Sequence, residues 1–240
     1  MNDILFIGGT HGNETIGMRA LESLEKTRDD FDWIIGNPRA LEQNKRFTEA
    51  DLNRSAPGML TGATYESRRA AELLFLVKQY SCVIDLHGTT QDCGIFTLIT
   101  NPTQENLRLA AMLDIDRIVI WPAITPDLTG PLSEFFPVGL EIECGKKDDP
   151  QTQKELERIL NKFLNNKDVL ANQDWRKSLE SKKIFEVCGE LKEDPGINLQ
   201  EFNEVKVAGE TFTPLLISVY KDAYDVICYK LKKRSVESLF

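Results

Sequence analysis

The pattern of hydrophobic and polar residues changes once along this chain, near residue 168. Before that point, short apolar runs typical of buried strands alternate with segments whose apolar residues recur every three or four positions, as in amphipathic helices. The runs predict strands at residues 4–8, 33–36, 82–86, 94–100, 117–121 and 138–144. The helical spacing predicts helices at residues 14–26, 64–80, 102–113 and 149–166. Such alternation is typical of an α/β sheet with helices on both faces.

The last third of the chain has a different pattern. Strand-like runs follow one another at residues 182–192, 204–220 and 225–233, separated by turn-forming residues, and no helix is expected among them. The polar stretch at residues 168–182 is interpreted as the connection. We therefore predict two domains, an α/β domain over residues 1–168 and a small all-β domain over residues 169–240.

The composition and charge of the chain limit the kinds of molecule that it is expected to bind. The chain has 240 residues, a formal net charge of −9 and a pI of about 4.9, so it has no general electrostatic attraction to nucleic acid or to an anionic membrane. No stretch approaches the roughly 18 apolar residues of a membrane-spanning helix, and the N-terminal residues lack the basic region of a signal peptide. The five cysteines are scattered without a CxxC pair, which argues against a disulfide framework and a cysteine zinc site. We expect a cytoplasmic protein that binds neither nucleic acid nor membrane.

A glycine-rich corner, GGTHGNE at residues 8–14, follows the first predicted strand. A phosphate-binding loop needs GxxxxGK[ST] or GxGxxG, and this corner supplies neither. A carboxylate at Glu14 would also repel a phosphate. The alternative is a metal site, because His11 and Glu14 lie three residues apart and share one face of a turn.

The two histidines of the chain favour the metal interpretation. His11 and His87 each follow an apolar run and each precede a glycine, and ligands in open α/β sheets bind at the carboxyl ends of strands. With Glu14, the two histidines would leave a fourth position open for water, which is the pattern of a catalytic zinc site. Asp85 could orient the His87 imidazole. Taken singly, a histidine at a strand end is more often a capping or hydrogen-bonding residue, and Glu14 alone is more often a first-turn helix acid, so the joint arrangement carries the interpretation.

A zinc hydrolase also needs a general base, and the strand predicted at residues 138–144 offers two candidates. Glu141 and Glu143 lie two positions apart and therefore point to the same face of the strand. Acids inside so apolar a strand are unfavourable unless they have a partner or a function. The alternative is an edge strand with a solvated acidic face.

Five ordered segments of the chain resemble those of the aspartoacylase and succinylglutamate desuccinylase family, relatives of the zinc carboxypeptidases. The segments are GGTHGNE, NPRA, KRFTEADLNR, DLHGTT and VGLEIECG, with weaker matches in GINLQEF and YKDAYDVICYK. The resemblance implies a zinc-carboxypeptidase-like mixed sheet flanked by helices and a small C-terminal β-domain. It also implies one zinc ion per subunit and a small N-acylated substrate that bears a carboxylate, and it is compatible with a homo-oligomer.

The resemblance assigns roles to particular residues of this sequence. His11, Glu14 and His87 match the zinc ligands, and Glu143, two residues before a glycine, matches the general base. The other roles are these: Arg46 polarises the scissile carbonyl and stabilises the oxyanion, Asn53 and Arg54 bind the substrate's α-carboxylate, Asn37 lines the pocket, and Tyr224 enters it from the C-terminal domain, with Tyr220 and Tyr229 nearby.

Ordinary explanations exist for several of these residues. Arg46 and Arg54 could be surface charges, as most arginines are. The NPRA segment could be a turn into a helix, with Asn37 as its cap and Pro38 in its first turn.

Two departures from the family pattern concern the substrate. Aspartoacylases carry an arginine before the base strand that holds the substrate's second carboxylate, and residues 124–137 contain no arginine. The family's usual proline after the base-strand glycine is replaced in ECGKKDD, where Lys146 or Lys147 offers a positive charge. Both departures bear on the acyl group and the amino acid, and neither touches the metal ligands or the base.

The sequence thus predicts a zinc-dependent amidohydrolase that acts on a small N-acyl amino acid of the N-acetylaspartate or N-succinylglutamate type. Two alternatives stay open. One is a metallo-carboxypeptidase acting on a peptide or wall-peptide fragment, and the other is a non-catalytic module that binds a carboxylated metabolite. The retained Glu143 argues against the module, because binding alone needs no general base.

Overall fold

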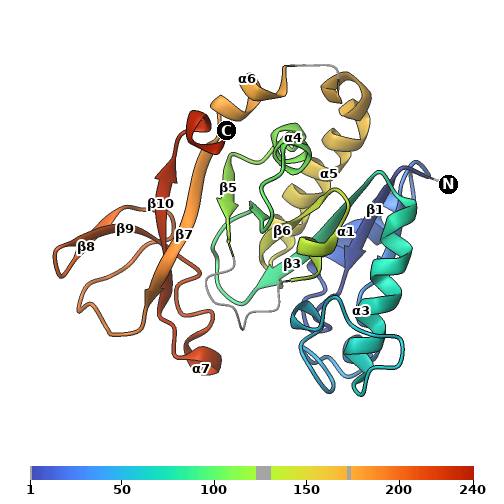
Figure 1. Cartoon of the computed structure of the whole chain (residues 1–240), viewed down its shortest axis with the longest axis horizontal. Helices are drawn as coiled ribbons and strands as arrows, with labels where there is room; N and C mark the ends of the chain where they lie inside the picture. The colour runs from blue at the N-terminus through green and yellow to red at the C-terminus, as the bar shows by residue number, and fades with distance from the viewer. Residues whose placement is uncertain (1, 123–130, 172–173) are drawn as a thin grey trace.

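The computed structural model describes residues 2–122, 131–171 and 174–240, and within them the strands form one ten-stranded mixed sheet (Figure 1). The order across the sheet is β2-β1-β3-β6-β4-β5-β7-β10-β9-β8. Every strand and helix predicted before residue 168 is present and overlaps its expected range. The predicted fold class, a mixed sheet flanked by helices with a C-terminal β part, is therefore confirmed.

The elements have the following bounds. The strands are β1 (Ile4–Gly8), β2 (Asp32–Ile35), β3 (Cys82–Thr89), β4 (Phe96–Ile99), β5 (Arg117–Ile120), β6 (Gly139–Lys146), β7 (Lys183–Leu191), β8 (Val205–Val207), β9 (Glu210–Leu215) and β10 (Cys228–Arg234). The α-helices are α1 (Ile16–Glu25), α2 (Pro38–Glu42), α3 (Tyr65–Leu76), α4 (Gln104–Met112), α5 (Pro150–Ala171), α6 (Trp175–Glu180) and α7 (Lys221–Tyr224). Short 3-10 helices are η1 (Leu52–Arg54), η2 (Val77–Gln79), η3 (Leu132–Phe135) and η4 (Val236–Leu239). Across the described ranges, no helix has the length and apolar character that a bilayer crossing requires.

Two hydrophobic cores cover opposite faces of the sheet, because side chains alternate along each strand. In β1, Ile4 and Phe6 join a core that also takes in buried residues of α1, α4 and α5. Leu5 and Ile7 point the other way and pack in a second core with residues of α3. The expectation that helices cover both faces is confirmed by these two cores.

The C-terminal strands extend the same sheet. β7 pairs parallel with β5, β10 pairs antiparallel with β7, and β9 follows antiparallel to β10. In Figure 1 these strands lie on the opposite side of the molecule from α3. A third core joins the two parts, with Phe96 and Val119 packed among Phe185, Leu215 and Leu231. The domain boundary after residue 168 stays a prediction.

The expectation of no helix beyond residue 168 is wrong, since α6 lies within the predicted connection and α7 follows β9. The reason for α6 is visible in its packing. Trp175 and Leu179 lie four positions apart, on one face, and both pack against the core beneath α4 and α5. A helix this short has too few residues to display a clear period in the sequence.

The site lies where β1, β3 and β6 end. β1 and β3 are parallel neighbours, and so are β3 and β6, so their carboxyl ends meet at one edge of the sheet. The pairing sets His87 of β3 directly beside Glu143 of β6. β6 has β3 on one side and β4 on the other, and both Glu141 and Glu143 are buried. The alternative of a solvated edge strand is therefore wrong.

Candidate active site and metal centre

Two glycines of the GGTHGNE corner allow the backbone to make the turn between β1 and α1. Gly9 has a φ of +68°, in the left-handed region that favours glycine. Gly12 packs so closely on α2 that a Cβ there would collide with the backbone of Ala40. These two glycines let the chain turn from β1 into α1 while His11 and Glu14 are directed inward. The corner is explained without a bound phosphate.

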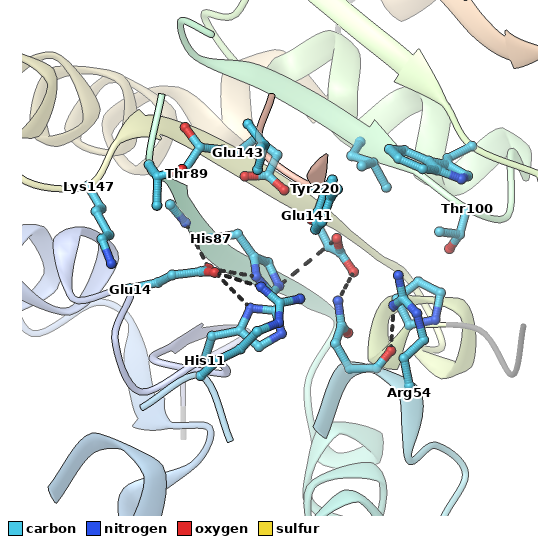
Figure 2. A pocket seen from close by; sticks show the side chains of 18 of the residues that line it. His11, Glu14, Arg54, His87, Thr89, Thr100, Glu141, Glu143, Lys147 and Tyr220 are labelled. Carbon is cyan, nitrogen blue, oxygen red and sulfur yellow. Dashed lines mark hydrogen bonds and ion pairs between the residues drawn. The ribbon is translucent and has the colours of Figure 1, made fainter. Parts of the chain in front are cut away.

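Three buried side chains meet at this corner, and they are the three predicted metal ligands. Nδ1 of His11 lies 3.0 Å from Oε1 of Glu14, and Nδ1 of His87 lies 3.3 Å from Oε2 of the same carboxylate. The two imidazole rings are 5.0 Å apart between centroids. The backbone N–H of Gly88 donates to Glu14 Oε2 at 3.1 Å and helps to fix the carboxylate. Figure 2 shows the three side chains directed at one another.

Each imidazole has a second carboxylate at its far nitrogen. Nε2 of His11 lies 3.1 Å from Asp51 Oδ1, and Nε2 of His87 lies 3.1 Å from Asp85 Oδ2. The Thr10 hydroxyl donates to Asp85 at 2.9 Å and holds it in turn. Carboxylates in this position fix the orientation and tautomer of an imidazole and leave the near nitrogen for a metal. Asp85 lies where the sequence predicted it, whereas Asp51 received no role from the sequence.

The donor set fits a divalent metal ion. One ligand atom from each of His11, Glu14 and His87 lies within 4.8 Å of the other two. Nδ1 of His11 is buried and faces Glu14 Oε1 at 3.0 Å, in a geometry that does not meet that of a hydrogen bond. An imidazole nitrogen and a carboxylate oxygen that face each other in this way could both coordinate one ion. Two imidazoles and one carboxylate with an open fourth position are the ligands of a catalytic zinc site.

A second group of potential ligands shares one histidine with the first. Asp85, His87 and Glu141 also lie within 4.8 Å of one another. This group supplies one imidazole, and its Asp85 accepts hydrogen bonds from Thr10 at both carboxylate oxygens. The group of His11, Glu14 and His87 supplies two imidazoles and one carboxylate, so it fits a zinc ion better.

The charges around the first group favour a cation at its centre. Burial alone would raise the pKa of Glu14, but the facing imidazoles hold it well below its usual range. Burial alone would lower the pKa of His87, but Asp85 and Glu141 raise it well above its usual value. A divalent cation would supply the positive charge that these buried carboxylates require.

The two acids of β6 have different surroundings. Glu141 accepts hydrogen bonds at one oxygen from Ser133 at 2.9 Å and from Asn53 at 3.4 Å. Glu143 has a buried Oε2 with no hydrogen-bond partner among the described residues, and burial raises its pKa to about 7. A pKa near neutrality and an unsatisfied oxygen suit a general base. Glu143 therefore fits this role better than Glu141.

Arg46 lies beside the candidate metal ligands. Its guanidinium forms ion pairs with Glu14 at 3.2 Å and with Asp51 at 3.1 Å. Asp51 thus touches both His11 and Arg46, and it also accepts from the backbone N–H of Asn53 at 2.9 Å. One carboxylate therefore ties the arginine and the neighbouring turn to the first histidine. Such a fixed guanidinium can meet negative charge that develops at the centre.

Asn53 and Arg54 follow on η1, and the structure brings both to the cavity. The Asn53 carboxamide accepts from the backbone N–H of Leu132 at 2.9 Å and donates to Glu141 at 3.4 Å. Arg54 NH1 donates to the backbone carbonyl of Asn53 at 2.7 Å. Asn53 is therefore held by both ends of its amide, while Arg54 is exposed and lines the cavity on the side away from Lys147 (Figure 2).

The tyrosine at the cavity is Tyr220, which corrects the choice of Tyr224. Tyr220 lines the cavity, and its ring centre lies 6.0 Å from the Arg46 guanidinium carbon. Tyr224 does not line the cavity and is 53% exposed. The reason is α7, which carries Tyr224 one helical turn beyond Tyr220 and onto the outer surface. Tyr229 packs on Trp121 with ring centres 4.4 Å apart.

We expect the two tyrosines to respond differently to the loss of their hydroxyls. Tyr220→Phe should lower kcat/KM on an accepted substrate by about 10-fold, the effect of one hydrogen bond in a binding pocket. Tyr224→Phe, four residues away on the exposed face, should change it by less than about 2-fold. Steady-state kinetics of the two variants checks this. Equal losses in both, or a loss only in Tyr224→Phe, would contradict the assignment.

Asn37 does not reach the cavity, which corrects its predicted place in the pocket wall. Its side-chain oxygen accepts from the backbone N–H of Ala40 and caps α2, as the ordinary explanation of the NPRA segment has it. Its amide nitrogen donates to Glu66 at 3.3 Å. Asn37 is therefore buried structural support.

Glu66 organises the loop that carries Arg46 and Asp51. This fully buried carboxylate accepts from the backbone N–H groups of Thr48, Glu49 and Ala50 and from the Thr48 hydroxyl. Burial would raise the pKa of Glu66, and these hydrogen bonds lower it below its usual value. No sequence signal marks it, because an acid in the first turn of a helix is ordinary.

One cavity of about 240 Å³ is bordered by the candidate metal ligands, the two acids of β6 and Tyr220. His11, Glu14, His87, Glu141 and Glu143 lie on its walls, with apolar contacts from Leu98, Trp121 and Val219. Part of the stretch without arginine, residues 124–130, falls outside the described residues. Acids, arginines and apolar surface in one small cavity suit a small charged organic ligand.

Sequence comparison places the chain among known proteins. Residues 1–166 match the family described as the succinylglutamate desuccinylase/aspartoacylase catalytic domain. A probable aspartoacylase of Prochlorococcus marinus subsp. pastoris is 32% identical over 184 residues, which cover 68% of this chain and 59% of that protein. A probable aspartoacylase of Nostoc sp. is 33% identical over 139 residues, covering 50% of this chain and 46% of that protein. The chain thus spans about half the length of these curated relatives.

Solved structures with a similar fold include murine aminoacylase 3 and the succinylglutamate desuccinylase from Chromobacterium violaceum. The first aligns with a TM-score of 0.72 and 18% sequence identity, over 97% of this chain and 95% of that chain. The second aligns with a TM-score of 0.70 and 17% identity, over 97% of this chain and 85% of that chain. At this level of identity, the likeness concerns the fold.

Proposed function

The chain belongs to the succinylglutamate desuccinylase/aspartoacylase family, and on that premise we propose that it is a zinc-dependent hydrolase that cleaves the amide bond of a small N-acyl amino acid. The observation that carries the proposal is the convergence of His11, Glu14 and His87 beside Glu143, on the wall of one cavity. A metal site and an unsatisfied buried carboxylate in the same cavity are the two parts that amide hydrolysis by water requires.

The chemistry follows from these residues. Zinc held by the two histidines and Glu14 would polarise the scissile carbonyl and lower the pKa of water. Glu143 accepts a proton from the attacking water as the new C–O bond forms. It then returns that proton to the amide nitrogen as the C–N bond breaks. One amide and one water thus become a carboxylic acid and an amine, with no other reactant.

The arginines bind and orient the substrate in this proposal. Arg46, fixed by Glu14 and Asp51, donates hydrogen bonds to the carbonyl oxygen as negative charge develops on it. Arg54 and Asn53 form the end of the cavity that takes the α-carboxylate of the amino acid, where a guanidinium can make a bidentate contact. Fixing the carboxylate end sets the position of the carbonyl before the water attacks.

Amine release is the experiment that tests the proposed function. Zinc-loaded protein should release free amino acid from N-acetyl-aspartate or from N-succinyl-glutamate, and removal of zinc by a chelator should stop the release. A set of short peptides with free C-termini serves as the comparison. Hydrolysis of the peptides alone would favour the metallo-carboxypeptidase alternative. Binding of the N-acyl amino acids without turnover would favour the non-catalytic module.

We also propose a reducing, cytoplasmic setting for this protein. All five cysteines are free thiols, and three of them are buried. Disulfides are rare in the cytoplasm and common in secreted proteins, so five free thiols fit the reducing compartment.

A further inference from the structure

One cation on the cavity wall has no part in the proposed chemistry so far. Arg46, Arg54 and Lys147 all line the cavity. Arg46 serves the scissile carbonyl and Arg54 the α-carboxylate. Lys147 lies on the far side of Glu14 and the histidines from Arg54, so the two cations occupy opposite ends of the site (Figure 2).

Lys147 is held in place at three points. Its backbone N–H donates to the Thr89 carbonyl at 2.9 Å, and its own carbonyl accepts from Arg19 at 2.7 Å. Its Nζ donates to the backbone carbonyl of Asn13 at 2.9 Å, within the turn between His11 and Glu14. A surface lysine ordinarily samples many rotamers, whereas this one is partly buried and anchored at both ends of its side chain.

The glycine after the second histidine makes room for this side chain. A Cβ added at Gly88 would lie only 3.0 Å from the Cβ of Lys147. The lysine stem therefore crosses directly over the backbone that follows His87. The ammonium group is thus brought close to the metal ligands by a specific fit, which a lysine on a free surface would not need.

The positive charge of Lys147 has no ion-pair partner within the described part of the chain. Among the residues that the structure describes, no carboxylate forms an ion pair with its Nζ within 4.0 Å. Arg46, in contrast, pairs with two carboxylates. An ammonium has three donors, and Asn13 takes one of them. The other two are available to an anion in the cavity.

The geometry of an amide substrate indicates which anionic group of the substrate would lie beside Lys147. An amide is planar, and in its trans form the amino acid and the acyl chain leave the C–N bond in opposite directions. With the amino acid's carboxylate at Arg54 and the carbonyl beside Arg46, the acyl chain runs toward Lys147. An acetyl group ends there in an uncharged methyl. A short dicarboxylic acyl group ends in a carboxylate.

Resting on the proposed function, we infer that Lys147 binds a terminal carboxylate on the acyl group and selects a short dicarboxylic acyl group over acetyl. The missing arginine fits this assignment. The family resemblance implies an arginine before the base strand for a second carboxylate on the amino acid, and residues 124–137 contain none. In this chain the second cation of the site lies on the acyl side instead.

A pair of substrates with the same amino acid tests the inference. N-succinyl-glutamate and N-acetyl-glutamate differ only in the acyl end, so the ratio of their kcat/KM values reports recognition there. Wild-type protein should favour the succinyl compound, and Lys147→Met should lower the ratio by about 10- to 100-fold, the loss of one charge-assisted contact. Lys147→Arg, which keeps the cation, should preserve most of the preference. Lys146→Met, at the neighbouring exposed lysine, should leave the ratio unchanged.

A binding measurement keeps the test independent of turnover. Calorimetric titration of zinc-loaded Glu143→Gln protein with the two compounds should give tighter binding of the succinyl compound, and adding Lys147→Met should abolish the difference. Circular dichroism and zinc content check that Lys147→Met folds and keeps its metal.

The outcomes separate the inference from the proposed function. An unchanged ratio in Lys147→Met, or an equal loss on both compounds, overturns the inference while the hydrolase stands. A Lys147-dependent preference in binding without any turnover supports the inference and overturns the hydrolase. Failure of both compounds to bind overturns both.

Discussion

The Glu143→Gln protein will bind zinc as the wild type does and turn over its N-acyl amino acid about 1,000-fold more slowly, within the range observed for loss of a general acid–base group. Glutamine has nearly the shape of glutamate but cannot accept a proton at neutral pH. The side chain makes no hydrogen bond through its buried Oε2 within the described residues, so the exchange removes the proton acceptor and little else. Zinc content by atomic absorption and amine release under saturating substrate measure the two halves of the result.

Glu141→Gln is the matched control, since it makes the same exchange two residues away on the same face of β6. Glutamine at this position keeps an oxygen that can accept from Ser133 and Asn53. We expect Glu141→Gln to lower kcat by less than about 10-fold, the worth of a weakened hydrogen bond. A large loss in Glu141→Gln with near-normal turnover in Glu143→Gln would move the general base to Glu141.

The fold was predictable from the sequence where local pattern and tertiary packing agree. The five residues of β1 are apolar throughout, and the structure buries both of its faces, Ile4 and Phe6 on one side and Leu5 and Ile7 on the other. α6 was missed because the burial of Trp175 and Leu179 depends on a core built by distant segments. The periodicity of a segment shows which of its residues could be buried. It does not show which surface of the rest of the chain will cover them.

The proximity of the proposed metal ligands and general base was predictable because each of His11, His87 and Glu143 lies at the end of an apolar strand. Strand ends in a parallel sheet converge, so the positions of His11, His87 and Glu143 along the chain already implied proximity. The position of a loop residue along the chain does not indicate which residues it will lie close to in the fold. Asp51 contacts His11 from a loop whose preceding residues Thr48 and Ala50 donate backbone hydrogen bonds to Glu66.

The tyrosine assignment shows the same limit. Tyr220 and Tyr224 are separated by one helical turn, and a motif match over so short a stretch does not say which ring faces inward. Burial decides the choice, since Tyr220 lines the cavity and Tyr224 does not. Asn37 was predicted to line the pocket, but its ordinary role as the cap of α2 and partner of Glu66 accounts for its burial.

Replacing His11 by alanine will weaken zinc binding by more than about 100-fold and abolish measurable turnover. Loss of a residue that merely orients a ligand weakens binding by about 10- to 100-fold, so loss of one of three ligands exceeds that range. The empty position also leaves Glu14 without the imidazole that lies 3.0 Å from it. Zinc affinity from competition with a chromophoric chelator, with circular dichroism to establish folding, measures the effect.

Asp51→Asn is the comparison that makes this result specific to ligation. The carboxamide keeps an oxygen toward Arg46 or His11 but removes the charge that both share. We expect its zinc affinity to fall by about 10- to 100-fold, less than in His11→Ala.

Zinc should also raise the melting temperature of wild-type protein by mass action, and this rise should vanish in His11→Ala. Full zinc occupancy and an unchanged zinc-dependent rise in His11→Ala would show that His11 serves the fold, and the metal would have to be sought at the group that Asp85 and Glu141 form with His87.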